Sequence, residues 1–342
     1  MSFSKSALKG LGVAAGVAAG AAGAAYGAQR AVSRNLRHRP DPDAGRLGTL
    51  RFDAARVLEA HDGGELPTYS RGTGPTVLFS HGVSISARTW VKQFDELPEH
   101  GVRVVAYDHR GHGASIAGST GHSVENLATD IHTVIDELDL HDVVLVGHSM
   151  GGIAAQAYAL HHAAHARAHV RGLVLLSTFA RTPLAAVGRS NGMAGRVSGW
   201  LDLAALTARP ELGTFIARLG FGRDPRASHV ELARQMLSEC EPDASRAAIL
   251  PLLGLDLTGE LGRLEIPTLV VGGMADILTP PLEARRLARH IPGARLHLFE
   301  RAGHMLMLER TDELHHLLFE FAREVGLPID ALDAPGSLGA VG

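Results

Sequence analysis

Short apolar runs alternate with longer amphipathic stretches along most of this chain. The apolar runs are rich in Val and Leu and occupy residues 76–80, 102–107, 143–147, 173–177, 268–272 and 295–300. Most of them are continuous, which is typical of strands that helices cover on both faces of a parallel sheet. Between them, apolar residues recur every three or four positions over residues 123–138, 153–160, 282–290 and 314–325. This alternation predicts an α/β fold built from βαβ units.

Two intervals depart from the alternation. Residues 51–69 contain the turn sequence Asp62-Gly63-Gly64 and are predicted to form an antiparallel hairpin that leads into the sheet. Residues 178–267 show no convincing strand and are too long for a plain connection. We therefore expect an inserted helical cap over about 180–262, within a folded domain that spans 50–326. Residues 327–342 are expected to form a flexible tail.

The first 40 residues differ from the rest in composition. Residues 10–28 hold no charge and consist mainly of Ala and Gly, and a helix of that length would extend roughly 28 Å, close to a bilayer's hydrocarbon core. Three interpretations remain open: a weak membrane anchor, a soluble Ala/Gly tail, or a secretory signal cleaved near residue 27. We favour the anchor, followed by a basic linker. The arginines after the run would then keep the large C-terminal body in the cytoplasm.

Charge is distributed unevenly along the chain. The net charge is −3, from 33 basic and 36 acidic residues, yet the first 39 residues contain six Lys or Arg and no acid. The acidic remainder is a poor surface for nucleic acid, whereas the basic end suits an anionic membrane surface. Cys240 is the only cysteine, which excludes an intrachain disulfide framework and any multi-cysteine metal centre.

The strongest motif follows the apolar run at residues 143–147, where the chain continues as Gly-His-Ser-Met-Gly and then as a stretch of small residues. Such a strand-to-helix turn holds its central side chain, here Ser149, in a strained conformation with the hydroxyl exposed. Gly147 and Gly151 flank it because side chains there would clash with neighbouring backbone. The positive end of the following helix favours developing negative charge. We predict that Ser149 is a nucleophile, the alternative being a structural serine.

A serine hydroxyl needs a base, held by an acid, to act as a nucleophile. Asp276 and His304 each follow a predicted strand, over residues 268–272 and 295–300. Because the carboxyl ends of parallel strands meet at one edge of a sheet, we expect both side chains to lie near Ser149, as acid and base. The alternative roles are a helix cap for Asp276 and a loop cap for His304.

A tetrahedral intermediate also needs two backbone N–H donors. We assign them to Met150, which follows the nucleophile, and to Val83, in the loop after residues 76–80. His81 in that loop is expected to order it. The histidines between residues 161 and 169 are interpreted as a solvated helix end and not as a metal site, because no carboxylate supports them.

Five segments carry a resemblance to a known family: SHGVS at 80–84, DHRGHGAS at 108–115, GHSMGG at 147–152, GGMADILTPP at 272–281 and ERAGHMLMLER at 300–310. Residues 50–326 resemble the α/β-hydrolase superfamily, in its serine esterase and lipase branch. The pairing of DHRGHG with GHSMGG is similar to monoacylglycerol lipases and related bacterial esterases. The resemblance implies an eight-stranded, mostly parallel sheet, no cofactor, and a triad that maps onto Ser149, Asp276 and His304.

Together these features predict a serine hydrolase that cleaves small-molecule esters or lipids through an acyl-enzyme. A cap rich in Leu and Phe favours an apolar substrate. The same scaffold also allows C–C bond hydrolysis, peracid formation of the cofactor-free haloperoxidase kind, thioester cleavage and aminopeptidase action. A non-catalytic binding protein that keeps the fold is the alternative from another class. The physiological substrate and the oligomeric state are not predicted.

Overall fold

The structure is a computed structural model that describes residue 36, residues 38–182 and residues 203–329. The predicted anchor at residues 10–28, part of the predicted cap (183–202) and the tail beyond residue 329 lie outside the described residues. Among the residues that are described, no helix combines the length and the apolar character needed to cross a membrane.

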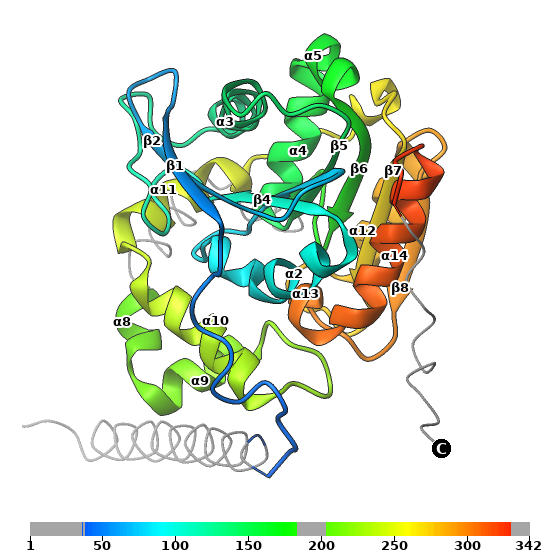
Figure 1. The fold of residues 1–342 in the computed structure, drawn as a ribbon. Coiled ribbons are helices and arrows are strands. Elements are labelled where there is room, and N and C mark those ends of the chain that lie inside the picture. The colour runs from blue at the N-terminus through cyan, green and yellow to red at the C-terminus, as the bar shows by residue number, and fades with distance from the viewer. Residues whose placement is uncertain (1–35, 37, 183–202, 330–342) are drawn as a thin grey trace, which may run out of the picture.

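One eight-stranded sheet forms the centre of the protein, in the order β1-β2-β4-β3-β5-β6-β7-β8 (Figure 1). The hairpin predicted from Asp62-Gly63-Gly64 is present, and its second strand also pairs antiparallel with β4. All other pairs are parallel, so the expected mostly parallel sheet is confirmed. The strands are β1 (Ala54–Glu59), β2 (Glu65–Arg71), β3 (Thr76–Ser80), β4 (Arg103–Tyr107), β5 (Val143–His148), β6 (Val170–Leu176), β7 (Thr268–Gly273) and β8 (Arg295–Phe299).

Helices cover both faces of the sheet, and each of the strands β3 to β7 contributes buried residues to two cores. In β3, Val77 and Phe79 pack in the core on one face, while Leu78 between them packs in the core on the other. The α-helices are α2 (Val91–Glu96), α3 (Val124–Glu137), α4 (Met150–His161), α5 (Ala163–His169), α8 (Leu203–Ala208), α9 (Pro210–Arg218), α10 (Ala227–Glu239), α11 (Pro242–Leu253), α12 (Pro281–His290), α13 (Leu306–Glu309) and α14 (Thr311–Glu324). Short 3₁₀ helices are η1 (Ala87–Trp90), η2 (Leu97–His100) and η3 (Leu261–Arg263).

The two faces have different helices. Figure 1 shows α3 and α4 on one side of the sheet and α2 and α14 on the other. The N-terminus of α3 is capped by Ser123, whose hydroxyl accepts a hydrogen bond from the Asn126 N–H at 3.0 Å. The helices α2, α5, α11 and α13 were not predicted. The helix α5 buries only Ala166 and so has no apolar stripe, and α11 carries Pro251 near its end.

The interval between β6 and β7 contains helices α8 to α11 and, within the described residues, no named strand. Figure 1 shows α8, α9 and α10 grouped together, away from α3 and α4. The chain before residue 50 also packs against this group. The Asp41 carboxylate accepts hydrogen bonds from the backbone N–H and the hydroxyl of Ser228 at 2.7 and 2.8 Å, and the Asp43 side chain is only 6% exposed. Ordered contacts therefore begin before Leu50, in the segment that composition suggested was a linker.

Candidate active site

The turn between β5 and α4 has the strain that the motif predicts. Ser149 has φ +53° and ψ −116°, in the left-handed half of backbone space that a residue with a side chain rarely adopts. Its backbone N–H donates to the carbonyl of Leu176 at 3.0 Å, and its carbonyl accepts from the Thr178 hydroxyl at 2.7 Å. These contacts attach the turn to the end of the neighbouring strand β6 and hold the strained conformation.

The glycines of this turn permit backbone contacts that a side chain would prevent. A Cβ at Gly151 would lie 2.2 Å from the carbonyl oxygen of Ser80, and one at Gly147 would lie 2.4 Å from the carbonyl oxygen of Gly151. A Cβ at Gly82 would lie 3.2 Å from the Cβ of Ser149. The loop after β3 therefore lies directly against the turn that carries the serine.

Asp276 and His304 are in direct contact, although 28 positions separate them. The His304 Nδ1–H donates to Oδ2 of Asp276 at 2.9 Å, and the Thr279 hydroxyl donates to the same oxygen at 2.6 Å. Burial alone would raise the pKa of Asp276, but attraction to His304 and these hydrogen bonds outweigh it, so the pKa is lowered from 3.8. The carboxylate is thus ionised at neutral pH and fixes the orientation of the ring.

The alternative role considered for Asp276, a helix cap, is not present, because α12 begins at Pro281 and no side chain caps it. Oδ1 of Asp276 accepts hydrogen bonds from the backbone N–H groups of Leu278 and Thr279, each at 2.8 Å. One carboxylate oxygen thus organises the turn before α12, and the other contacts His304. Ordering of this turn and orientation of the histidine are therefore compatible functions of the same side chain.

Ser149 lies next to His148, and the His148 ring is 4.7 Å from the His304 ring, centroid to centroid. The hydrogen bonds that the structure gives Ser149 involve its backbone, and within the described part of the chain its hydroxyl has no partner. Contact between this hydroxyl and His304 therefore stays a prediction. Catalytic hydrogen bonds of this kind are often long before substrate binds and shorten in the complex.

The two predicted backbone donors lie beside the serine. Met150 begins α4, so its N–H belongs to the first helical turn, whose amides have no acceptor within the helix. Val83 follows Gly82, which packs against Ser149. His81 orders this loop: its Nδ1–H donates to the Gly82 carbonyl at 2.7 Å, and its Nε2 accepts from the backbone N–H of His109 at 2.9 Å. Burial lowers the pKa of His81 to about 4, which keeps the ring neutral.

Sequence reasoning missed three residues around the predicted base. His148 donates from Nε2 to the backbone carbonyl of His304 at 3.1 Å, and burial together with the nearby His304 holds the pKa of His148 well below its usual value. Thr279 shares the Asp276 oxygen with the histidine. Glu309 accepts from the backbone N–H of Gly303 at 3.0 Å. The sequence signal for Thr279 was a polar residue three positions after Asp276. The signal for Glu309 was an acidic residue five positions after His304.

The segment DHRGHG forms a buried polar network and not a reactive group. Arg110 is fully buried, and its guanidinium contacts Asp130 at 2.6 Å and Asp62 at 2.9 Å. The neighbouring Asp108 accepts hydrogen bonds from the Tyr69 hydroxyl and from the backbone N–H of Ala87. These groups connect the loop after β4 to the hairpin, to α3 and to η1.

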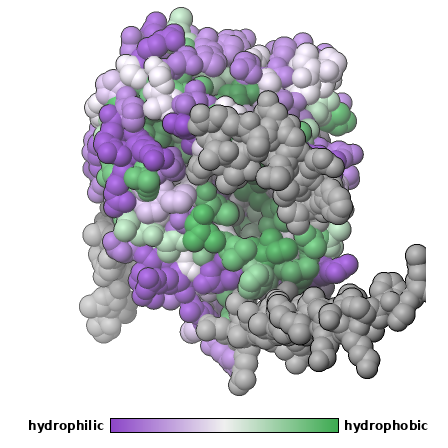
Figure 2. Space-filling view, turned by 180° about the vertical axis from the view of Figure 1, so that it is seen from behind, coloured by the Kyte–Doolittle hydropathy of each residue, from purple (hydrophilic) through white to green (hydrophobic). Residues whose placement is uncertain are grey.

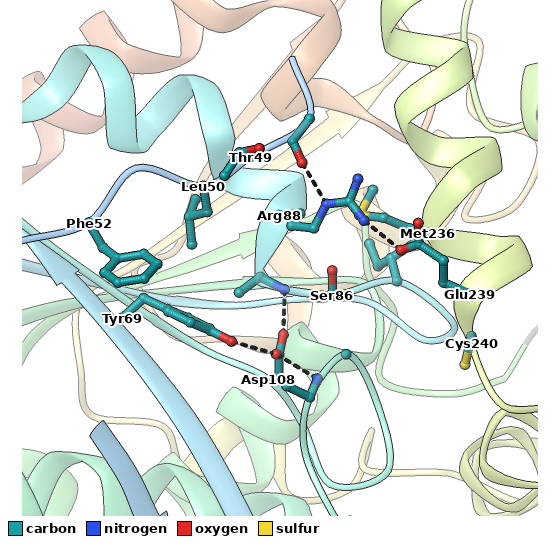
Figure 3. Close-up of a pocket in the computed structure, with 15 residues that line it drawn as sticks. Thr49, Leu50, Phe52, Tyr69, Ser86, Arg88, Asp108, Met236, Glu239 and Cys240 are labelled. Atoms are coloured by element: carbon teal, nitrogen blue, oxygen red, sulfur yellow. Dashed lines mark hydrogen bonds and ion pairs between the residues drawn. The ribbon is translucent and has the colours of Figure 1, made fainter. Parts of the chain in front are cut away.

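A cavity of about 510 Å³ lies beside this network, between the hairpin, η1 and α10 (Figure 3). Asp108 and Tyr69 line one side, and the ion pair between Arg88 and Glu239 lines the other. Its lining contains neither Ser149 nor the two predicted triad partners. We therefore keep the candidate active site at the β5–α4 turn. No group of three or more His, Cys, Asp or Glu side chains in the described ranges has the arrangement of a metal site.

The sheet order, the strained turn and the Asp–His pair define an α/β-hydrolase. A sequence profile described as "alpha/beta hydrolase fold" matches residues 75–311, so the chain belongs to this family.

Individual relatives span almost the whole domain. The chain is 28% identical over 263 residues to the non-heme chloroperoxidase CPO-A1 of Kitasatospora aureofaciens, which covers 75% of this chain and 94% of that protein. A solved esterase from Exiguobacterium antarcticum has a TM-score of 0.69 and 25% identity, covering 79% of this chain and all of the other. A thermophilic esterase from Thermogutta terrifontis has a TM-score of 0.65 and 30% identity, covering 80% and 99%. The chain is therefore similar to proteins with different reported activities.

Proposed function

We propose that the protein is a serine hydrolase that cleaves carboxylic esters through an acyl-enzyme at Ser149. The observation that carries this proposal is the hydrogen bond between Asp276 and His304, formed at the same sheet edge as the strained serine turn. His304 takes the proton of the Ser149 hydroxyl as the oxygen attacks the substrate carbonyl. Asp276 stabilises the imidazolium that results.

The remaining steps use the backbone and water. The N–H groups of Val83 and Met150 bind the oxyanion of the tetrahedral intermediate. The intermediate collapses as His304 returns its proton to the leaving alcohol. Water then attacks the acyl-enzyme, again with His304 as the base, and the acid product leaves with Ser149 regenerated.

An apolar acyl or alcohol part is supported by the surface around the loop of Asp276. Three large apolar side chains there are well exposed, namely Met274 (37%), Ile277 (63%) and Leu278 (52%). Figure 2 shows apolar surface gathered around a hollow on the face opposite the view of Figure 1. Apolar surface near a reactive centre favours substrates with a hydrocarbon part.

The test is turnover of a p-nitrophenyl ester series, together with labelling by a fluorophosphonate probe. Ser149→Ala removes the nucleophile and is expected to abolish labelling and to lower kcat by about 10⁴-fold or more. Ser119→Ala is the matched control, because this exposed hydroxyl bonds only to the carbonyl of Asp62. Equal turnover by wild type and Ser149→Ala would refute the proposal, as would a wild type that the probe does not label.

Peracid formation is the second candidate, because relatives of this chain are named non-heme chloroperoxidase and non-heme haloperoxidase. In that reaction hydrogen peroxide replaces water and attacks the same acyl-enzyme, giving a peracid and free Ser149. The peracid then oxidises halide outside the site. Peroxide-dependent bromination of a dimedone reporter in acetate buffer, compared with ester hydrolysis by the same preparation, separates the two activities. A panel of thioesters, C–C hydrolase substrates and amino-acid amides in the labelling assay tests the remaining alternatives.

A further inference from the structure

One partly buried carboxylate outside the predicted triad contacts the loop that carries His304. Glu309 is the last residue of α13, five positions after the histidine. Its Oε1 accepts a hydrogen bond from the backbone N–H of Gly303 at 3.0 Å, and its Oε2 accepts from the backbone N–H of Gly222 at 2.7 Å. One side chain therefore holds two backbone segments that are far apart in sequence.

These two segments are packed backbone to backbone. A Cβ at Gly222 would lie 2.1 Å from the carbonyl oxygen of Arg301, and one at Gly303 would lie 2.4 Å from the nitrogen of Gly222. Hydrogen bonds join the segments on both sides: His304 N–H donates to the carbonyl of Gly220 at 2.9 Å, and Arg223 N–H donates to the carbonyl of Arg301 at 2.8 Å. The backbones of the two segments therefore lie so close together that no side chain fits between them at Gly222 or Gly303.

The chain around Gly222 connects α9 to α10, so it belongs to the cap and not to the sheet domain. The loop of His304 is held on its other side by the strand end that leads to Asp276, where Ala275 N–H donates to the carbonyl of Ala302 at 2.8 Å. The base therefore lies between the acid's loop and the cap. Removal of the Glu309 carboxylate would leave two N–H groups beside it without their acceptor.

We propose that Glu309 is a positioning residue that fixes the loop of His304 against the cap and thereby holds the imidazole in register with Ser149 and Asp276. This inference rests on the proposed function of those three residues. Glu309 acts through the backbone at Gly303, directly before the base, and has no role in proton transfer itself. The cap thus contributes to the placement of the base.

The variants are chosen to separate positioning from folding. Glu309→Gln keeps the size of the side chain and one carbonyl acceptor, whereas Glu309→Ala removes both acceptors. Glu313→Gln is the matched control, because that carboxylate is 55% exposed and forms an ion pair with Arg310 at 3.6 Å, away from Gly303 and Gly222 in its bonding. Each variant is assayed for kcat, KM, the rate of fluorophosphonate labelling at Ser149, and the final labelled fraction.

A displaced base slows proton removal without changing how substrate binds. We expect kcat and the labelling rate to fall together, by about tenfold in Glu309→Gln and about 10²-fold in Glu309→Ala, with KM within about threefold of wild type. The final labelled fraction is expected to equal that of wild type, and Glu313→Gln to behave as wild type.

Three results would overturn the inference. Labelling of Glu309→Gln at the wild-type rate would show that the carboxylate does not position the base. A lower labelled fraction at an unchanged rate would show a folding defect only. If the wild type itself is not labelled at Ser149, the proposed function fails and the inference fails with it. This outcome is seen in the wild type alone, so it is distinguishable from a failure that only the Glu309 variants show.

Discussion

The sharpest stability prediction concerns Asp43, which lies before the predicted start of the domain. Its carboxylate is 6% exposed and contacts Lys92 Nζ at 3.1 Å, the Arg226 guanidinium at 2.5 Å and His229 Nε2 at 2.8 Å. Lys92 belongs to α2 of the sheet domain, whereas Arg226 and His229 lie at the start of α10 in the cap. Asp43 therefore connects the N-terminal segment, the sheet domain and the cap through one charge.

The perturbation is Asp43→Asn, which removes the charge and keeps the shape. Loss of one partner from a buried ion pair costs roughly 3–5 kcal/mol. The lower end applies here, because Lys92 keeps a second partner in Glu96 at 2.7 Å and the Arg226 side chain is 43% exposed. We expect the free energy of unfolding to fall by about 3 kcal/mol, and the melting temperature by roughly 6–12 °C at about 2–4 °C per kcal/mol.

The effect has a defined pH dependence. Burial alone would raise the pKa of Asp43, but hydrogen bonds from His229, Lys92 and Arg226 outweigh it and hold the pKa well below 3.8. A carboxyl whose pKa is lower in the folded state stabilises the fold above the pKa of the unfolded chain and loses that contribution as the pH falls. The difference between wild type and Asp43→Asn is therefore largest near neutral pH and shrinks below about pH 4.

The assay is thermal and urea unfolding followed by circular dichroism between pH 3 and pH 7. Asp243→Asn is the matched control, because that side chain is 95% exposed and its ion pair with Arg246 lies on the surface. We expect the control to lose about 0.5 kcal/mol or less. The reasoning is refuted if Asp43→Asn unfolds together with the control at pH 7, or if the difference between Asp43→Asn and wild type is the same at pH 3.

Three further changes follow from the site. Asp276→Asn is expected to lower kcat by about 10⁴-fold with little change in KM, because the amide favours the wrong tautomer of the histidine; steady-state ester hydrolysis measures this. Gly151→Ala would place a Cβ 2.2 Å from the Ser80 carbonyl oxygen, so we expect fluorophosphonate labelling to slow by about 10²-fold; labelling at the wild-type rate would show that the turn can adapt. Arg110→Met would leave Asp130 buried without its cation, and we expect a loss of roughly 3–5 kcal/mol in urea unfolding.

The sequence predicted most accurately the elements whose signals are local. Strands covered on both faces, such as β3 and β5, are continuous apolar runs, because both sets of alternating side chains are buried. The serine turn was equally visible, because its glycines and serine form a local pattern, although the space that Gly151 leaves is filled by Ser80 of another strand. Elements without a local signal were missed. The helix α11 has Pro251 near its end, and α5 buries one side chain.

What the sequence could not provide is the partner of a polar residue across the fold. Asp41-Pro42-Asp43 has the composition of a linker, and only the distant cations of Lys92 and α10 make it part of the domain. The same holds for Glu309, whose second acceptor site faces a cap residue 87 positions earlier. A carboxylate removed from water is stable only beside hydrogen-bond donors or cations. An acidic residue in an apolar stretch therefore indicates that such donors exist in the fold, but the sequence does not identify them. Motifs at strand ends thus indicate the candidate reactive residues. The residues that fix their geometry are found only from contacts across the fold, which no local pattern encodes.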